Sequence, residues 1–98
     1  MTGGRYLSNA HLRCCWKRTQ EGGMPRMMVS VPKKLFKRAV KRNLLKRRIR
    51  EAFRVQKQLL DGNPVDMMFV YTGKEIDSFG DIYAAMQQIL SSVRDQQK

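Results

Sequence analysis

The chain has 98 residues, a length that suits one small domain with one thin core. Apolar residues make up 42% of it, too many for a wholly disordered chain, and 20 Lys and Arg against 8 Asp and Glu give a formal net charge of +12. Such an excess of positive charge causes self-repulsion in a compact state, so we expect a polyanionic partner. Nucleic acid is the first candidate and an anionic membrane surface the second.

Several classes of protein are excluded at this stage. No apolar run approaches the roughly 18–20 residues of a membrane span, and the N-terminus has no signal-peptide stretch. Cys14 and Cys15 are adjacent, so they supply neither a disulfide framework nor a zinc ligand set, and His11 is the only histidine. We therefore expect a single domain over residues 1–98, cytoplasmic, with no catalytic residue, no metal ligand and no membrane partner.

The first half of the chain predicts strands. Residues 5–17 alternate between a mostly apolar and a mostly polar set, the period of a strand, and a bend near Ser8-Asn9 would divide this segment into two strands. A polar turn follows at 19–23. Residues 26–31 predict a second strand, which Pro32 ends because proline has no N–H to donate.

The second half predicts two helices around a strand. A long helix spans about 38–60 and stops at Asp61-Gly62-Asn63-Pro64, a strand covers 65–72, and a closing helix runs from about 79 to 93. Ser78 is a plausible N-cap, with Asp81 three residues on as its capping-box partner. Residues 95–98 are expected to fray.

The long helix has two distinct faces. Projection at about 100° per residue gathers one stripe, apolar apart from its glutamine: Leu45, Ile49, Ala52, Phe53, Gln56, Leu59 and Leu60. An adjoining arc, here called the cationic ridge, contains no acid: Asn43, Lys46, Arg47, Arg50, Arg54 and Lys57. Glu51, outside that arc, is a candidate salt-bridge partner for Arg47 or Arg54.

The positive charge is concentrated on this element. Residues 33–57 hold twelve Lys or Arg and one acid, a net charge of +11, whereas the other 73 residues carry +1. A solvated face normally mixes both signs, and like charges at i, i+4 cost a few tenths of a kcal/mol each. The ridge therefore indicates a phosphate-binding surface, and its arginines suit bidentate contacts.

Two segments carry a resemblance to a known family. Ser30-Val31-Pro32-Lys33-Lys34 and the run from Ala39 to Arg54, with Arg42-Asn43-Leu44 and Arg50-Glu51-Ala52-Phe53-Arg54 inside it, resemble the bacterial ribonuclease P protein component. The order of the later strand and helix also fits that family. The resemblance implies an α+β fold: a small mixed sheet, a long basic crossover helix in a left-handed βαβ unit, where generic rules favour a right-handed one, and a C-terminal helix.

The resemblance also implies a function. The protein would be a subunit of an endoribonuclease that removes the 5′ leader of precursor tRNA, with a catalytic RNA carrying the chemistry and holding most of the Mg²⁺; the protein alone would bind no cofactor. Its partners would be that RNA and precursor tRNA, the single-stranded leader lying in a cleft on the sheet face. The resemblance implies RNA contacts for Arg42, Asn43, Lys46, Arg47 and Arg50, with Lys33 and Lys34 at the edge. The charge pattern of the ridge adds Arg54 and Lys57 to the predicted RNA-binding residues.

Three positions depart from the family pattern. Leu44 replaces the last arginine of Arg-Asn-Arg, and Pro32 replaces the serine before Lys-Lys. Leu35-Phe36 stands where the family has a glycine, with one apparent extra residue. The family usually begins with a helix that helps to wall the leader cleft, whereas this sequence starts near the first strand, so it is either truncated or has a misassigned start. We expect the chain to support assembly with the catalytic RNA better than discrimination of the leader.

Other interpretations stay open. One is a non-enzymatic, ribosomal-type protein that binds structured RNA, and another is a DNA-binding module, for which no base-reading residues outside the ridge can be named. Aromatic side chains on the predicted strands could stack on unpaired bases, although core packing is the favoured interpretation for each: Tyr6, Trp16, Phe69 and Tyr71.

Overall fold

The computed structural model describes residues 5–9, 11–18, 26–60 and 65–96, and it contains one four-stranded mixed sheet. The strands are β1 (Arg5–Ser8), β2 (Leu12–Arg18), β3 (Arg26–Ser30) and β4 (Val65–Tyr71). They lie in the order β1-β2-β4-β3, and only β3 and β4 are parallel. The predicted turn at 19–23 and helix stop at 61–64 lie outside the described residues.

The expected bend after Ser8 is confirmed, and Asn9 explains it. The Asn9 side-chain oxygen accepts hydrogen bonds from the backbone N–H groups of His11 (3.0 Å) and Leu12 (2.9 Å), which closes the β1–β2 hairpin. Its side-chain amide donates to the carbonyl of Ala85 (3.1 Å) in the C-terminal helix. An Asx-type turn therefore both separates the two strands and fastens their connection to that helix.

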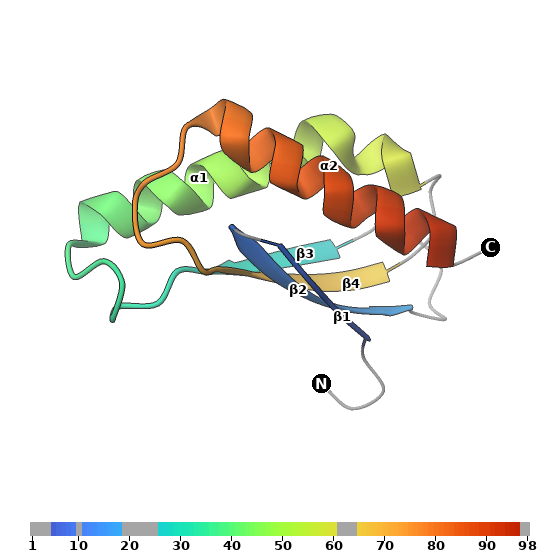
Figure 1. Cartoon of the computed structure of the whole chain (residues 1–98), viewed down its shortest axis with the longest axis horizontal. Coiled ribbons are helices and arrows are strands. Elements are labelled where there is room, and N and C mark those ends of the chain that lie inside the picture. Colours follow the sequence, from blue (N-terminus) through green and yellow to red (C-terminus); the bar gives the residue numbers. More distant parts are fainter. Residues whose placement is uncertain (1–4, 10, 19–25, 61–64, 97–98) are drawn as a thin grey trace.

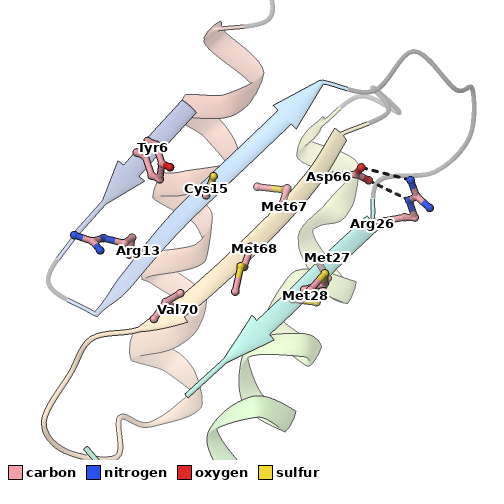
Figure 2. Close-up of a pocket in the computed structure, with 10 residues that line it drawn as sticks. All are labelled: Tyr6, Arg13, Cys15, Arg26, Met27, Met28, Asp66, Met67, Met68 and Val70. Carbon is pink, nitrogen blue, oxygen red and sulfur yellow. Dashed lines mark hydrogen bonds and ion pairs between the residues drawn. The ribbon is translucent and has the colours of Figure 1, made fainter. Parts of the chain in front are cut away.

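Both helices, α1 (Ala39–Gln56) and α2 (Phe79–Gln96), cover the same face of the sheet (Figure 1). Figure 2 views the opposite face: β3 and β4 run in the same direction and α1 lies behind them, so the β3–α1–β4 crossover is left-handed. This handedness is the one that the family resemblance implies, against the generic preference.

The core fills the space between the sheet and the two helices. The sheet contributes alternate residues of β2 and β4, among them Cys14, Trp16 and Phe69, each at most 4% exposed. The predicted apolar stripe of α1 is buried as expected, apart from Leu59, which is half-buried. The stripe fixes the rotation of α1 about its axis and so decides which side chains of that helix face solvent.

The long helix ends earlier than the sequence pattern predicts. Regular α-helix stops at Gln56, and Lys57–Leu60 forms a 3-10 helix. Gln56 is 2% exposed, and its amide donates to the carbonyls of Ala52 (3.3 Å) and Tyr83 (3.0 Å). The tighter turn brings Leu60 into the core. Lys57 begins this 3-10 helix, whose rotation per residue differs from the 100° of an α-helix. The projection that placed Lys57 on the ridge therefore does not hold for it.

The start of α2 confirms Ser78 as the N-cap, although within the described residues the Asp81 carboxylate makes no capping-box bond back to it, and the end of the helix lies beyond the predicted one. The hydroxyl oxygen of Ser78 accepts a hydrogen bond from the backbone N–H of Asp81 (3.2 Å), as an N-cap does. The helix continues to Gln96, so the expectation that Asp95 frays is wrong. Val93, the last residue of the predicted helix, is fully buried and anchors the final turn.

Candidate nucleic-acid interface

The stripe of α1 directs the cationic ridge toward solvent. Asn43, Arg47, Arg50 and Arg54 are exposed, and Lys46 and Lys57 are half-buried. Within the described part of the chain, no acidic side chain pairs with Lys46, Arg47 or Arg50. Their charges are therefore available to an external anion.

Arg54 differs from its neighbours because it already has a partner. Its guanidinium forms a two-point ion pair with Glu51 three residues earlier, one arm being the 3.0 Å contact from Nε to Oε2. The hydrogen bond from Arg54 lowers the pKa of the Glu51 carboxyl below its ordinary value, and the same bond raises the pKa of Arg54. One of the two predicted pairings of Glu51 is thus confirmed, and it reduces the net charge of this end of the ridge.

Two further predicted RNA contacts, Lys33 and Lys34, lie in the segment 31–38 that leads into α1. Lys33 and Lys34 are exposed in a turn closed by a hydrogen bond from the Leu35 N–H to the Pro32 carbonyl (3.1 Å). Phe36 is 7% exposed and packs on Tyr71, with ring centroids 5.8 Å apart. A buried aromatic thus anchors the turn where the family pattern has a glycine.

Arg42 also stabilises this turn. Its Nη1 donates to the carbonyls of Phe36 (2.7 Å) and Lys37 (2.9 Å), just before the helix begins. The N-cap position, Arg38, makes no side-chain capping bond. Arg42 does not replace such a cap, because the free N–H groups of the first turn need an acceptor and a guanidinium only donates; it holds the carbonyls of the entry segment. The sequence pattern indicated only an RNA contact for Arg42, and this internal role was missed.

The face of the sheet that the helices leave uncovered is a second candidate surface (Figure 2). A row of side chains crosses it in register, one from each strand: Tyr6, Cys15, Met68 and Met28. Tyr6 and Met28 are each 65% exposed, and the row borders an open depression of about 800 Å³. Arg13 lines it as well, and Arg26 closes one end through an ion pair with Asp66 (Nε to Oδ1, 3.0 Å).

This surface corrects one expectation for the aromatic residues. Trp16, Phe69 and Tyr71 are core, as the sequence favours, but core packing is wrong for Tyr6. Tyr6 lies on the short edge strand β1, where helix α2 does not reach its side of the sheet. The period-two pattern places Arg13 in the polar set, and so on the solvent-facing side, but it places Tyr6 in the opposite set. The hairpin after Ser8 pairs Tyr6 with Cys15 and so brings Tyr6 to the side of Arg13.

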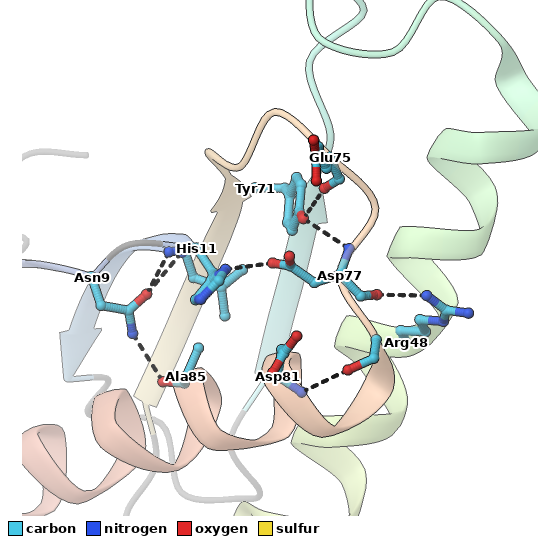
Figure 3. Close-up of polar contacts among 10 residues, drawn as sticks. Asn9, His11, Arg48, Tyr71, Glu75, Asp77, Asp81 and Ala85 are labelled. Carbon is cyan, nitrogen blue, oxygen red and sulfur yellow. Dashed lines mark hydrogen bonds and ion pairs between the residues drawn. The ribbon is translucent and has the colours of Figure 1, made fainter.

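A polar network joins the basic helix to the loop before α2 (Figure 3). Asp77 is its centre: Oδ2 lies 2.5 Å from His11 Nδ1, the backbone N–H donates to Tyr71 Oη (3.2 Å), and the backbone oxygen accepts from Arg48 Nη1 (2.5 Å). Burial and the Asp77 carboxylate both raise the pKa of Tyr71, whose hydroxyl donates to the carbonyl of Glu75. His11, predicted as an ordinary surface residue, is thus half-buried and part of this network.

The described residues contain no group of three or more His, Cys, Asp or Glu side chains arranged to hold a metal ion. In the same part of the chain, no helix is both long and apolar enough to cross a membrane.

Comparison with known proteins decides the family. The family model described as Ribonuclease P matches residues 1–94. The chain belongs to the ribonuclease P protein family.

Its sequence is 41% identical over 70 residues to the ribonuclease P protein component of Porphyromonas gingivalis, covering 65% of this chain and 51% of that protein. The ribonuclease P protein component of Nitrosococcus oceani is 50% identical over 38 residues, 39% of this chain and 32% of the relative. The chain thus matches about half, or less, of these curated ribonuclease P proteins.

Solved structures of ribonuclease P proteins share the fold. The Staphylococcus aureus protein superposes with a TM-score of 0.78 at 26% identity, over 92% of this chain and 81% of that chain. The Thermotoga maritima protein gives a TM-score of 0.80 at 23% identity, over 92% and 84%. The mixed sheet with a long and a C-terminal helix is therefore the architecture of ribonuclease P proteins.

Proposed function

We propose that the chain is the RNA-binding protein subunit of ribonuclease P and assists removal of the 5′ leader from precursor tRNA. The observation that carries this proposal is the cationic ridge, which adjoins the buried stripe of α1 and leaves Lys46, Arg47 and Arg50 without acidic partners in the described chain. Its membership of the ribonuclease P family supplies the identity of the RNA. The proposal includes a cytoplasmic location, where bacterial precursor tRNA is made.

The ridge would bind the catalytic RNA through its phosphates. Arginine side chains on one face of a rigid helix suit a phosphate backbone, because each planar guanidinium can donate two parallel hydrogen bonds. Lys33, Lys34 and Arg42 would extend the contact around the helix start, with Arg42 also holding its own turn. By reducing phosphate repulsion, this surface would help catalytic RNA and precursor tRNA to approach each other.

The chemistry would belong to the RNA. Magnesium requires oxygen donors, and within the described residues no group of three or more acidic, histidine or cysteine side chains comes together. We propose that the catalytic RNA holds the Mg²⁺, as the family resemblance implies, and that this chain acts by binding and positioning RNA.

The uncovered sheet face would hold the single-stranded leader. Such binding combines a cationic track with surfaces on which bases stack. Arg13 and the exposed ring of Tyr6 provide one of each at the same depression, and the methionine side chains beside them present an adaptable apolar surface.

The experiment is reconstitution at low Mg²⁺. RNA-free protein alone should not cleave precursor tRNA, and the catalytic RNA alone should cleave it slowly. Adding the protein should accelerate cleavage, which separates this function from that of a ribosomal-type RNA-binding protein. Failure to stimulate cleavage, with RNA binding intact, would contradict the proposal.

A variant then tests the sheet face. Tyr6→Ala should weaken binding of precursor tRNA while binding of mature tRNA stays unchanged, because mature tRNA has no leader. Gln88→Ala, an exposed change on the outer side of α2, is the matched control and should alter neither. Equal losses for both tRNA forms would contradict a leader-specific role.

A further inference from the structure

A small pocket beside the cationic ridge has no role in the function proposed above. It has a volume of about 240 Å³ and is lined by Arg47, Arg48, Glu51 and Phe79. Arg47 is also a member of the ridge, so the pocket and the ridge form one continuous surface. Phe79 is 38% exposed, which makes it one of the few large apolar side chains at the surface of the described chain.

The aromatic wall of this pocket is held in place. Phe79 is the first residue of α2, and its ring lies against that of Tyr83, with centroids 6.1 Å apart and planes inclined by 53°. Tyr83 is itself fixed through its backbone carbonyl, which accepts the buried amide of Gln56. The Phe79 ring therefore lies against Tyr83 on one side and lines the pocket beside α1 on the other, without being buried.

Arg48, one of the two arginines that line the pocket, is held by a hydrogen bond. Arg48 Nη1 is bonded to the Asp77 carbonyl at 2.5 Å, and Asp77 in turn contacts His11 and Tyr71 (Figure 3). Only Ser78 lies between Asp77 and Phe79 along the chain. A binding site whose walls are fixed before the ligand arrives loses less entropy on binding.

The charges around the pocket select the kind of ligand. Glu51 is neutralised by Arg54, whereas exposed Arg47 has no acidic partner in the described chain. The pocket therefore combines a half-exposed aromatic ring with a free guanidinium. A flat base can stack on the Phe79 ring, and a phosphate can bind the Arg47 guanidinium. A nucleotide contains both a base and a phosphate, joined covalently.

We propose that this pocket binds one unpaired nucleobase of the RNA that occupies the ridge, with the base on Phe79 and its phosphate on Arg47. The inference rests on the proposed RNA-binding function of the ridge. Bases inside a duplex are stacked on each other and cannot enter the pocket, so only a bulge, a loop or a strand end supplies the ligand. Contacts to phosphates alone cannot distinguish an unpaired base from a paired one. The pocket would therefore let the protein recognise places where the RNA is unpaired.

Two RNA hairpins test this inference directly. Both have the same stem, and one carries a single bulged 5-iodouridine, a base that crosslinks to aromatic side chains on irradiation. Affinities are measured at one salt concentration, because electrostatics otherwise dominates the comparison. The wild-type chain should bind the bulged hairpin more tightly, by about five-fold to about a hundred-fold, the range expected for one stacked base. The crosslink should map to Phe79.

Substitutions at Phe79 separate stacking from simple apolar contact. Phe79→Ala and Phe79→Leu should abolish the preference for the bulge, whereas Phe79→Trp should keep it; Phe79→Leu retains most of the apolar volume and so guards against a folding defect. Gln88→Ala, elsewhere on the same helix, should keep the preference. A wild-type chain without bulge preference, or a preference that survives Phe79→Leu, would overturn the inference. Arg50→Glu tests the ridge separately, since it should weaken binding of both hairpins alike.

Discussion

Arg48 on the basic helix donates a 2.5 Å hydrogen bond from Nη1 to the backbone oxygen of Asp77, 29 residues further along the chain. This bond connects α1 to the loop that precedes α2. The arginines of the basic segment are therefore not equally free to bind RNA: Arg48 and Arg42 also hold backbone carbonyls, and Arg54 also holds Glu51.

Arg48→Ala should lower the free energy of unfolding by about 1–2 kcal/mol, because the Asp77 carbonyl loses a charged donor in a partly buried position. The adjacent substitution Arg47→Ala is the matched control. Arg47 is exposed, and its side chain makes no hydrogen bond within the described chain, so its removal should change stability by less than about 0.5 kcal/mol. Urea denaturation measures both, and equal effects would show that the Arg48–Asp77 bond does not stabilise the fold.

Gly73 is predicted to be intolerant of a side chain. An ideal Cβ there would lie 2.8 Å from Tyr71 Oη and 3.0 Å from Cζ, and the fully buried tyrosine ring cannot move aside. Gly73→Ala should therefore destabilise the protein by about 1–3 kcal/mol. At Gly80, in the first turn of α2, the nearest atom to such a Cβ is Ser78 Oγ at 3.9 Å. Gly80→Ala should be neutral or stabilising by up to about 1 kcal/mol. Thermal unfolding that shifts in the same direction for both would contradict this contrast.

The sequence predicts the elements that have their own periodicity. The four strands, both helices, the buried stripe and the exposed arginines of the ridge follow from local patterns, and Ser78 is recognisable as a cap. Contacts between distant segments are not predictable in that way. The packing of Phe36 on Tyr71 and the His11–Asp77 contact depend on how the elements meet. The early end of α1 has the same cause, because the Gln56 amide finds its partner on α2.

Glu51→Gln should strengthen RNA binding. The substitution removes the only acid of the basic segment and releases Arg54 from its ion pair. Five to seven phosphate contacts imply a slope of log affinity against log salt of roughly −3.5 to −6, and one released cation should steepen it by about one. Asp95→Asn, an equal change of charge at the far end of α2, should leave the slope unaltered. A salt titration of binding to the catalytic RNA checks both variants, and a shallower slope for Glu51→Gln would contradict the role of Arg54.

The two cysteines should differ in reactivity although they are neighbours. Cys14 is fully buried, and burial raises the pKa of its thiol to about 12, so that the reactive thiolate is scarce at pH 8. Cys15 points to the uncovered face and is half-buried. A disulfide reagent should modify one thiol per native chain and two after urea denaturation, and Cys15→Ser should abolish the native reaction. Rapid modification of both thiols in the native protein would contradict the burial of Cys14.

The central claim is that the cationic ridge of α1 forms the main RNA-binding surface, and matched charge reversals test it most directly. Arg50→Glu changes the ridge, whereas Arg94→Glu makes the same change of charge near the end of α2. The equilibrium affinity for the catalytic RNA of ribonuclease P is measured for both at one salt concentration. We predict that Arg50→Glu weakens binding at least several-fold while its melting temperature stays near that of the wild type, and that Arg94→Glu has little effect on affinity. Equal loss of affinity in the two variants would contradict the account, because it would mean that net charge, and not the ridge, determines RNA binding.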